Sequence, residues 1–436
     1  MKQSEFKKRR KQLMRQVGKG NIALIGSAPM RARNRDVNYP FRQDSDFYYL
    51  TGFNEPDSLA VFIPGRKQGE YILFCREFDE KKALWEGAHA GLEGATTHYK
   101  ADDSFPIDDL NDILPGMLED KGKVYYPMGR DSDLDHRLLD WINHIRSQSR
   151  TGVNAPGELV SLEHILHEMR LFKSPEELKL MRRAAEVSAS AHVKAMQTCK
   201  PGLYEYQLEA EIVHHFLQDG LRAVAYPSIV AGGKNACVLH YTENADKLKS
   251  GDLLLIDAGA ECDHYAADIT RTFPVSGRFS EPQKLLYQLV LDAQTAALAQ
   301  VKPGASWHLA HDASVETITK GLVTLGLLKG RIAKLIKDEK YKQFYMHRIG
   351  HWLGMDVHDV GDYKVAKEWR LLEPGMVLTI EPGLYIPKDC EGVDPQWRGI
   401  GIRIEDDVLV TAEGHEILTG GVPKTIADIE NLMQAN

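Results

Sequence analysis

The chain has 436 residues, of which 43% are hydrophobic and 27% are charged. This balance is typical of a globular protein of roughly two to three domains, and it excludes a disordered, collagen-like or coiled-coil chain. The formal net charge is −8, so we expect no nucleic acid partner, because phosphate binding needs a concentrated basic face. No window reaches the ~18 apolar residues of a membrane helix, so we expect no membrane partner either.

Cysteine usage predicts a reducing environment. The chain has five cysteines, an odd number, and no C-x-x-C pair occurs. A disulfide framework and a zinc finger are therefore both disfavoured. The amino-terminal residues are basic, but the apolar segment of a secretion signal does not follow them. We therefore expect a cytoplasmic protein.

Short β-rich runs alternate with helical patterns in the first third of the chain. Aromatic and β-branched residues predict strands over residues 21–27, 46–53, 58–64, 71–77 and 123–127. Apolar residues at spacings of three and four predict helices over residues 107–120 and 131–148. This alternation predicts an α/β domain, and neither a phosphate-binding loop nor a G-x-G-x-x-G motif occurs in it.

A clear helix start follows at Ser174. Ser174 and Glu177 form the pattern of a capping box, and Pro175 suits the first helical position. The helix that begins there ends before the turn at residues 200–202. We therefore divide the chain into an N-terminal domain, residues 1–172, and a second domain, residues 173–436.

The second domain contains an internal duplication. A Lys-Pro-Gly turn precedes a predicted helix at residues 200–202 and again at 302–304. The apolar run GDLLLIDAG at 251–259 resembles GMVLTIEPG at 375–383, and each predicts a strand that ends in an acid. A second predicted strand with another acid follows each run. The two halves therefore predict a pseudo-twofold arrangement that presents four carboxylates to one centre: Asp257, Asp268, Glu381 and Glu405.

Asp257 and Asp268 are expected to face each other. If the hairpin between them closes symmetrically about Cys262 and Asp263, the two aspartates occupy opposed positions, with Cβ atoms about 4.5–5.5 Å apart. Two carboxylates surrounded by leucines repel each other there and are poorly solvated. A shared proton or a cation would compensate them. The alternative is that one aspartate faces solvent at a strand end.

Three histidines lie within twelve residues: His347, His351 and His358. The spacing of the first two would suit a helical metal pair, but Gly350 and Gly354 favour a loop or strand. Arg348 stands where the glutamate of an H-E-x-x-H motif would be, so that motif is absent. A single histidine here is often structural, whereas three beside paired acids indicate a functional site.

These motifs supply an oxygen-rich ligand set with one imidazole: Asp257, Asp268, His351, Glu381 and Glu405. Carboxylates without a thiolate favour Mn²⁺, with Co²⁺, Fe²⁺ and Zn²⁺ as competitors. Four carboxylates carry too much charge for one divalent ion but suit two. Two ions about 3.5–4 Å apart can hold a bridging hydroxide and clamp the oxygens of a hydrolytic transition state. For Glu381 or Glu405 taken alone, the alternative is that the residue lies on an exposed face and forms a surface salt bridge.

The order and local contexts of these five residues resemble the two-metal peptidases of the pita-bread fold. The segment from His347 to Asp359 is similar to the signature of their proline-specific members, and residues 41–53, FRQDSDFYYLTGF, resemble the aminopeptidase P group. The resemblance implies an α/β N-terminal domain followed by an α+β pita-bread catalytic domain with a pseudo-twofold internal repeat. One departure is visible, because relatives often carry Trp-x-Gly-x-Arg where this chain has Trp85-Glu86-Gly87-Ala88-His89.

The resemblance implies a role for each metal ligand. Asp257 would bind one ion alone, and His351 with Glu381 would bind the other. Asp268 and Glu405 would bridge the two ions. The cofactor implied is therefore a pair of divalent metal ions in each chain, with Mn²⁺ expected first.

The resemblance also implies catalytic and substrate-binding residues. Glu381 would take the proton of the attacking water, His358 would stabilise the developing oxyanion, and His240 would line the substrate site. Four further residues are expected to contact or orient the substrate: His347, Tyr385, Arg403 and Trp85. In relatives the tryptophan approaches the active site of a neighbouring subunit, and His89 in place of arginine puts that contact in doubt.

The function implied is that of an Xaa-Pro aminopeptidase, which releases the N-terminal residue of a peptide whose second residue is proline. One alternative is a prolidase, which is restricted to Xaa-Pro dipeptides. Another is a catalytically inactive pita-bread binding protein, against which the five retained ligands speak. The expected partners are peptides with an N-terminal Xaa-Pro and further copies of the chain, in a dimer or tetramer.

Overall fold

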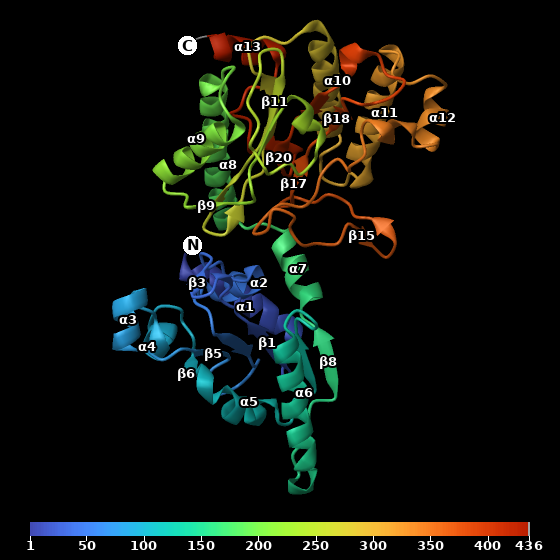
Figure 1. The fold of residues 1–436 in the computed structure, drawn as a ribbon. Coiled ribbons are helices and arrows are strands. Elements are labelled where there is room, and N and C mark those ends of the chain that lie inside the picture. Colours follow the sequence, from blue (N-terminus) through green and yellow to red (C-terminus); the bar gives the residue numbers. More distant parts are fainter. Residues whose placement is uncertain (435–436) are drawn as a thin grey trace. The chain divides into compact units, whose positions relative to one another are not determined.

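The computed structural model describes residues 1–434 (Figure 1). The chain divides into two compact units, Met1–Met169 and Arg170–Asn436. The boundary proposed from the sequence, after residue 172, lies close to this division. Among the described residues, none of the helices combines the length and the apolarity needed to cross a bilayer.

The first unit is built on a six-stranded sheet with the order β6-β5-β4-β1-β7-β8. The pairs β1–β7, β7–β8 and β5–β6 are parallel, whereas β4 runs antiparallel between β1 and β5. The strands are β1 (Ile22–Gly26), β4 (Leu59–Phe62), β5 (Tyr71–Cys75), β6 (Asp103–Pro106), β7 (Lys123–Tyr126) and β8 (Glu158–Ser161). A separate two-stranded ribbon consists of β2 (Ala32–Asn34) and β3 (Val37–Asn38).

Helices of the first unit connect and cover these strands. They are α1 (Gln3–Val17), α2 (Ser45–Thr51), α3 (Glu80–Glu86), α4 (Gly91–Thr97), α5 (Leu110–Leu118), α6 (Ser132–Ser147) and the start of α7 (Glu163–Leu171), with short 3₁₀ turns η1 (Ile107–Asp109) and η2 (Ser149–Thr151). The apolar stripes of α5 and α6 pack on the sheet in one hydrophobic cluster. The spacing of their leucines in the sequence predicts this packing.

The strand predicted over residues 46–53 is wrong, because residues 46–51 lie in a helix that ends before Gly52. The helix α2 begins after Asp44, whose carboxylate accepts a hydrogen bond from the Phe47 amide at 2.9 Å, and it ends at Gly52 in the left-handed conformation. Every residue of α2 is buried. A helix that is buried all round shows no polar face, so the β preference of its Phe and Tyr residues dominated the sequence pattern.

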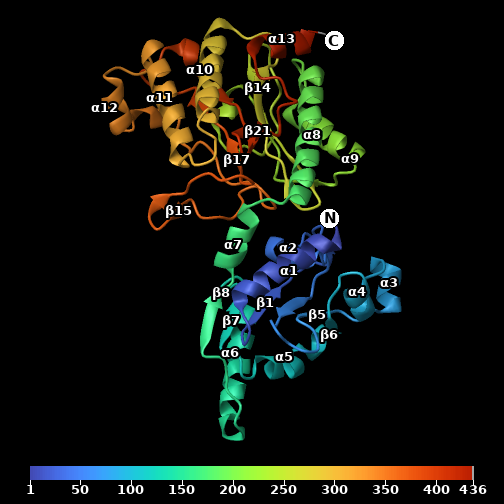
Figure 2. The same cartoon turned by 180° about the vertical axis from the view of Figure 1, so that it is seen from behind.

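The second unit places its strands between two groups of helices (Figures 1 and 2). On one side lie α8 (Pro175–Thr198) and α9 (Glu205–Gln218), and on the other α10 (Glu281–Leu298), α11 (His308–Thr324) and α12 (Ile332–Lys337). The predicted capping box is present at the start of α8. The Ser174 hydroxyl accepts from the Glu177 amide at 3.4 Å, and the Glu177 carboxylate accepts from the Ser174 amide at 2.8 Å.

The second unit contains two successions of four strands, and both have the same connectivity. In the first, β11 (Leu253–Asp257) and β14 (Thr270–Pro274) pair antiparallel and enclose the hairpin of β12 (Ala260–Cys262) and β13 (Tyr265–Ala266). In the second, β17 (Val377–Ile380) and β20 (Asp406–Val410) enclose β18 (Gly383–Ile386) and β19 (Ile400–Arg403). A pair of long helices precedes each succession, so the repeat inferred from the sequence is a structural repeat.

The remaining elements of the second unit are short. They are β9 (Ala223–Val224), β10 (Ile229–Gly232), β15 (Lys364–Val365), β16 (Glu368–Trp369), β21 (His415–Ile417), α13 (Ile426–Gln434) and the 3₁₀ turns η3 (Gly233–Cys237), η4 (Lys340–Gln343) and η5 (Pro395–Trp397).

The two successions meet along β14 and the start of β20. The Glu405 amide donates to the Thr270 carbonyl at 3.1 Å. Arg271 and Asp406 form a fully buried ion pair at 2.6 Å, and Lys424 adds a second cation 2.6 Å from the same carboxylate. A buried pair of this kind tolerates little displacement, because either group alone would be an uncompensated charge. The seam therefore fixes the strand ends beside which the acids lie.

Candidate metal centre

The four acids lie at matching points of the two successions. Asp257 ends β11 and Glu381 directly follows β17, while Asp268 precedes β14 and Glu405 precedes β20. Because the successions meet at these ends, all four carboxylates line one pocket of about 260 Å³. The duplicated strand pattern thus brings together the acids that the sequence singles out.

The first hairpin has a different register from the predicted one. Its turn consists of Asp263 and His264, which have φ angles of 49° and 71°. The turn lies one residue further along the chain than the predicted turn of Cys262 and Asp263. Each residue of the first strand therefore pairs with a residue two positions later than predicted. Asp257 consequently pairs with Thr270, and the prediction that it lies directly opposite Asp268 is wrong.

Tyr226 joins the two aspartates instead. Its hydroxyl lies 2.6 Å from Oδ1 of Asp257 and 2.6 Å from Oδ1 of Asp268. No sequence pattern marks this residue, because it stands in a connecting segment before Pro227 with no periodic pattern around it. Thr270 is a second residue that was not predicted, and its hydroxyl donates to the Glu405 carboxylate at 2.6 Å. The available signal was its place two residues after Asp268, since such residues share a strand face.

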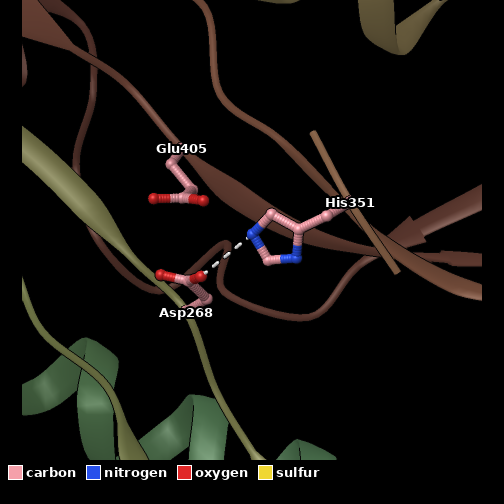
Figure 3. Close-up of side chains that lie close together, drawn as sticks. All are labelled: Asp268, His351 and Glu405. Carbon is pink, nitrogen blue, oxygen red and sulfur yellow. Dashed lines mark ion pairs between the residues drawn. The ribbon is translucent and has the colours of Figure 1, made fainter. Parts of the chain in front are cut away.

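Asp268, His351 and Glu405 form the tightest group of the centre (Figure 3). One ligand atom from each lies within 4.8 Å of the other two. Nε2 of His351 is 3.4 Å from Oδ2 of Asp268 and 3.7 Å from Oε1 of Glu381. Figure 3 shows the donor groups of the three side chains turned toward one another, although they come from three separate segments.

His351 presents Nε2 to the acids because its other ring nitrogen is engaged. Nδ1 lies 3.0 Å from the carbonyl oxygen of Trp352, so it carries the proton and donates. The backbone of His351 is fixed as well, since its amide donates to the Thr379 hydroxyl and its carbonyl accepts from the Thr379 amide. A carbonyl that fixes the tautomer in this way is typical of metal-ligating histidines.

The histidine loop, residues 347–359, contains no α-helix, as its glycines predict. A Cβ atom on Gly350 would overlap the carbonyl of Thr379, and one on Gly354 would overlap the carboxylate of Asp359. Only glycine permits these two close approaches. The loop is therefore held directly against the strand that leads to Glu381.

Asp359 anchors the end of this loop. Its carboxylate accepts hydrogen bonds from Arg170 at 2.5 Å and from Lys173 at 3.0 Å, and all three side chains are buried. Burial alone would raise the pKa of Asp359, but the charges of Arg170 and Lys173 outweigh it and hold the pKa below its ordinary value. The anchor thus depends on an ionised carboxylate.

The pKa values of the centre are shifted because its acids are buried close together. Burial raises the pKa of Asp257, raises that of Glu381 to about 7 and raises that of Glu405 well above its ordinary value. For Asp268 burial is outweighed by the hydrogen bond and charge of His351, which lower its pKa. For His351 burial is outweighed by Asp268 and Glu381, which raise its pKa to about 9. The protein alone therefore does not supply enough positive charge to ionise every acid.

The donor set fits divalent cations. Four carboxylates line the pocket and Arg403 is the arginine buried beside them, so the fully ionised acids carry an excess of negative charge. Carboxylate oxygens and one imidazole are the donors that Mn²⁺ and similar ions prefer. Bound cations would supply the missing charge and would keep the acids in their ionised form.

Arg403 and Tyr385 support the centre from behind. Arg403 donates to Asp257 at 2.6 Å, to the Tyr385 hydroxyl at 3.1 Å and to the Thr270 hydroxyl at 3.1 Å. Tyr385 is fully buried and lies 2.9 Å from Nε2 of His347. Burial, together with the charge of Arg403, lowers the pKa of His347 to about 3, so its ring is neutral. Arg403 and His347 line the pocket, whereas Tyr385 does not line it and hydrogen-bonds to both of them.

The other two histidines lie at the exposed side of the pocket. The ring of His358 packs edge-on to that of His351, with 4.4 Å between the centroids, and burial lowers the pKa of His358. His240 is exposed and lines the pocket together with Leu239. Arg348, from the histidine loop, is also exposed and lines the pocket.

Trp85 belongs to the first unit and not to the unit that contains the pocket. It lies on α3, a helix without buried residues, and its side chain is 89% exposed. Nε2 of His89, four residues after Trp85, lies 3.2 Å from the Glu77 carbonyl within the same unit. A role of Trp85 toward substrate stays a prediction.

The fold and the centre together define a pita-bread metallopeptidase. Residues 179–412 match the Metallopeptidase family M24, and residues 6–125 match the Aminopeptidase P, N-terminal domain. The chain belongs to metallopeptidase family M24. The predicted fold class and the resemblance to the aminopeptidase P group are thereby confirmed, and the chain is a metal-dependent peptidase.

Individual relatives agree with this assignment over nearly the whole chain. The sequence is 45% identical to an Xaa-Pro aminopeptidase of Haemophilus influenzae over 98% of this chain and 97% of that protein. The structure matches that of Pseudomonas aeruginosa aminopeptidase PepP with a TM-score of 0.99 at 58% identity, covering 100% of this chain and 98% of that one. It matches a zinc-substituted Escherichia coli aminopeptidase P in complex with product with a TM-score of 0.97 at 44% identity, covering 100% and 99%.

Proposed function

We propose that the protein removes the N-terminal residue from peptides whose second residue is proline, and that it uses two divalent metal ions, with Mn²⁺ preferred. The observation that carries this proposal is the convergence of four acids and His351 in one pocket. The Xaa-Pro aminopeptidases and aminopeptidase P structures that the chain resembles support the choice of substrate.

The geometry favours Asp268 as a bridging ligand. Its Oδ1 shares Tyr226 with Asp257, while its Oδ2 faces Nε2 of His351. The two oxygens of one carboxylate thus point to the two sides of the centre. We propose that Asp257 holds one ion, that His351 and Glu381 hold the other, and that Asp268 and Glu405 bridge.

Paired divalent ions supply Lewis acidity toward the scissile carbonyl and lower the pKa of a nearby water. Glu381 is the residue suited to move protons there. Its carboxylate lies in the pocket beside His351, with Oε1 3.7 Å from Nε2 of that ring, and a carboxylate within reach of the attacking water can act as a general base. It would take a proton at its carboxylate from the attacking water and return it to the proline nitrogen, which departs as a secondary amine.

The remaining pocket residues bind and orient the peptide. His358 lies at the exposed side of His351, where a ring N–H can donate to the scissile carbonyl oxygen as charge develops on it. His347 stays neutral, with Nε2 accepting from Tyr385, and offers a ring face to the proline. We propose that His240 also contacts the substrate from the exposed side of the pocket. We also propose that Trp85 reaches the pocket of a neighbouring copy.

A panel of matched peptides tests the proposal. Ala-Pro, Ala-Pro-Ala and a longer Ala-Pro peptide are compared with an Ala-Ala control on enzyme stripped with a chelator and reloaded with Mn²⁺, Co²⁺ or Zn²⁺. We expect kcat/KM for Ala-Pro-Ala at least equal to that for Ala-Pro, little cleavage of the control and the highest rate with Mn²⁺. Cleavage of Ala-Pro alone would indicate a prolidase, and full activity after complete metal removal would refute the two-metal mechanism.

We propose further that the protein is cytoplasmic and assembles as a dimer or tetramer, with an N-terminal domain up to residue 172. Light scattering on the full chain in Mn²⁺ buffer tests the assembly. A monomer at micromolar concentration with full activity would contradict it, and it would also remove the basis for a Trp85 contact between copies.

A further inference from the structure

Glu205 is a buried carboxylate outside the metal centre. It is the first residue of α9 and is completely inaccessible to solvent. Its two oxygens accept four hydrogen bonds: from the Gly232 amide at 2.7 Å, the Asn235 side chain at 3.0 Å, the Tyr241 hydroxyl at 2.8 Å and the Asp246 amide at 2.8 Å. Buried carboxylates are costly unless they are compensated, and here hydrogen-bond donors compensate the charge.

All four donors belong to one loop, residues 232–246. The carboxylate therefore holds the beginning of this loop, its middle and its end. Gly232 permits the contact, because a Cβ atom there would press on Leu248 and on the carboxylate of Glu205. Four of the hydrogen bonds that hold the loop therefore end on Glu205, and a further one joins the Asn244 side chain to Glu209 at 2.9 Å.

The loop carries residues of the metal pocket. Leu239 and His240 line the pocket, and Tyr241, which donates to Glu205, follows His240 directly in the chain. Val238 is 54% exposed and His240 is exposed, whereas the Tyr241 ring packs against a small hydrophobic cluster that includes Ile229 and Leu255. The Tyr241 hydroxyl is therefore the anchor nearest to His240 along the chain.

The beginning of the loop is rigid for a separate reason. The turn η3 packs so closely on β19 that a Cβ atom on Gly401 would overlap the Ala236 carbonyl. The end is tied by Asn244, which accepts from the Val230 amide at 2.9 Å and donates to the Ser228 carbonyl at 2.9 Å. Between these fixed ends, the path of residues 238–243 depends on Tyr241 and Glu205.

We propose that Glu205 is a positioning residue that, through Tyr241, holds His240 at the substrate side of the metal pocket. This inference rests on the function proposed above. A histidine that must meet a substrate gains from a fixed position, since a displacement of about 1 Å can reduce a rate by roughly 10²-fold. Glu205 acts only through the loop, because it touches neither the pocket nor the metal ligands.

Two variants test the hydrogen bond from Tyr241 and the whole set of hydrogen bonds to Glu205 separately. Tyr241→Phe removes one hydroxyl and keeps the ring, whereas Glu205→Gln keeps the shape but replaces one acceptor oxygen by a donor. We expect kcat/KM for Ala-Pro-Ala to fall roughly tenfold in Tyr241→Phe and up to roughly 10²-fold in Glu205→Gln. Bound metal, measured by elemental analysis, is expected to stay at the wild-type level in both. Tyr206→Phe is the matched control, since it changes an exposed tyrosine of α9 by the same atom.

A double-mutant cycle with His240→Ala identifies the route of the effect. If Tyr241 and Glu205 act through His240, each substitution changes kcat/KM less than about twofold when His240 is already alanine, because contacting residues do not act additively. Hydrogen exchange of residues 238–246, measured without substrate, is expected to become faster in Tyr241→Phe and to stay unchanged in Tyr206→Phe.

Several results would overturn the inference: wild-type kcat/KM in Tyr241→Phe, an equal loss with and without His240, or loss of bound metal from Tyr241→Phe. If Glu205→Gln does not fold, Tyr241→Phe alone decides. An inactive wild type would refute the proposed function instead, and the exchange measurement would then still test whether Tyr241 holds the loop.

Discussion

Replacing Arg403 by alanine is expected to destabilise the metal-free protein strongly. The Arg403 side chain is buried and pairs with Asp257 at 2.6 Å. Removing one partner of a buried ion pair leaves an uncompensated charge and costs about 3–5 kcal/mol of unfolding free energy. In a unit of this size 1 kcal/mol shifts Tm by roughly 2–4 °C, so the expected decrease is about 6–20 °C.

Metal should reverse part of this loss, because a cation bound at Asp257 compensates the same carboxylate. A ligand at 100 times its Kd adds about 2.7 kcal/mol of stability. We expect Mn²⁺ to raise the Tm of Arg403→Ala by more than it raises that of the wild type. Calorimetry on chelator-treated protein, repeated after addition of Mn²⁺, measures both increments.

Arg222→Ala provides the control for this experiment, because Arg222 is an exposed arginine of the same unit. Its Tm is expected to follow the wild type in both conditions. An equal rise of Tm with Mn²⁺ in Arg403→Ala and wild type would refute the reasoning, since Asp257 would then not share its charge between the arginine and a metal.

Three further predictions concern the ligands, the histidines and pH. Asp268→Asn is expected to retain less metal than Asp257→Asn in elemental analysis, since a bridging carboxylate serves both ions; equal retention would argue against bridging. His358→Ala is expected to keep its metal and to lose about 10²–10³-fold in kcat, whereas His351→Ala is expected to lose metal, and the reverse pattern would exchange their roles. The pKa of Asp359 is lowered in the folded state, so its ionisation stabilises the fold above the ordinary carboxyl pKa of about 3.9, and this contribution is lost as pH falls through the folded-state value. Urea unfolding between pH 7 and pH 3 should therefore show a weaker loss of stability toward acid pH in Asp359→Asn than in wild type.

Local sequence patterns were enough to predict much of the fold and several residues of the metal centre. The start of α8 was predictable because Ser174, Pro175 and Glu177 act within one turn. The acids were predictable because each stands beside an apolar strand, and the repeat of that pattern indicates a shared location. The loop conformation at Gly350 was also predictable, since glycine disfavours a helix.

What the sequence could not predict depends on burial and on distant contacts. The helix α2 resembles a strand because its surroundings are apolar on every side. The register of the first hairpin depends on a turn in which Asp263 and His264 both have positive φ. Asp and His adopt that conformation more often than other non-glycine residues, but their identity does not fix which two positions form the turn. Tyr226 and Glu205 meet their partners through tertiary structure alone, so no spacing in the sequence marks them.

The seam between the two strand successions would give bound metal a mechanical role. Each succession contributes two acids, so ions bound between them would tie two distant parts of the chain together without a covalent bond. Such a tie restricts the chain as a cross-link does, but it can be withdrawn. Chelation would then act on this protein as reduction acts on a disulfide: it would loosen the unit from Arg170 onward, whose strands present all four acids.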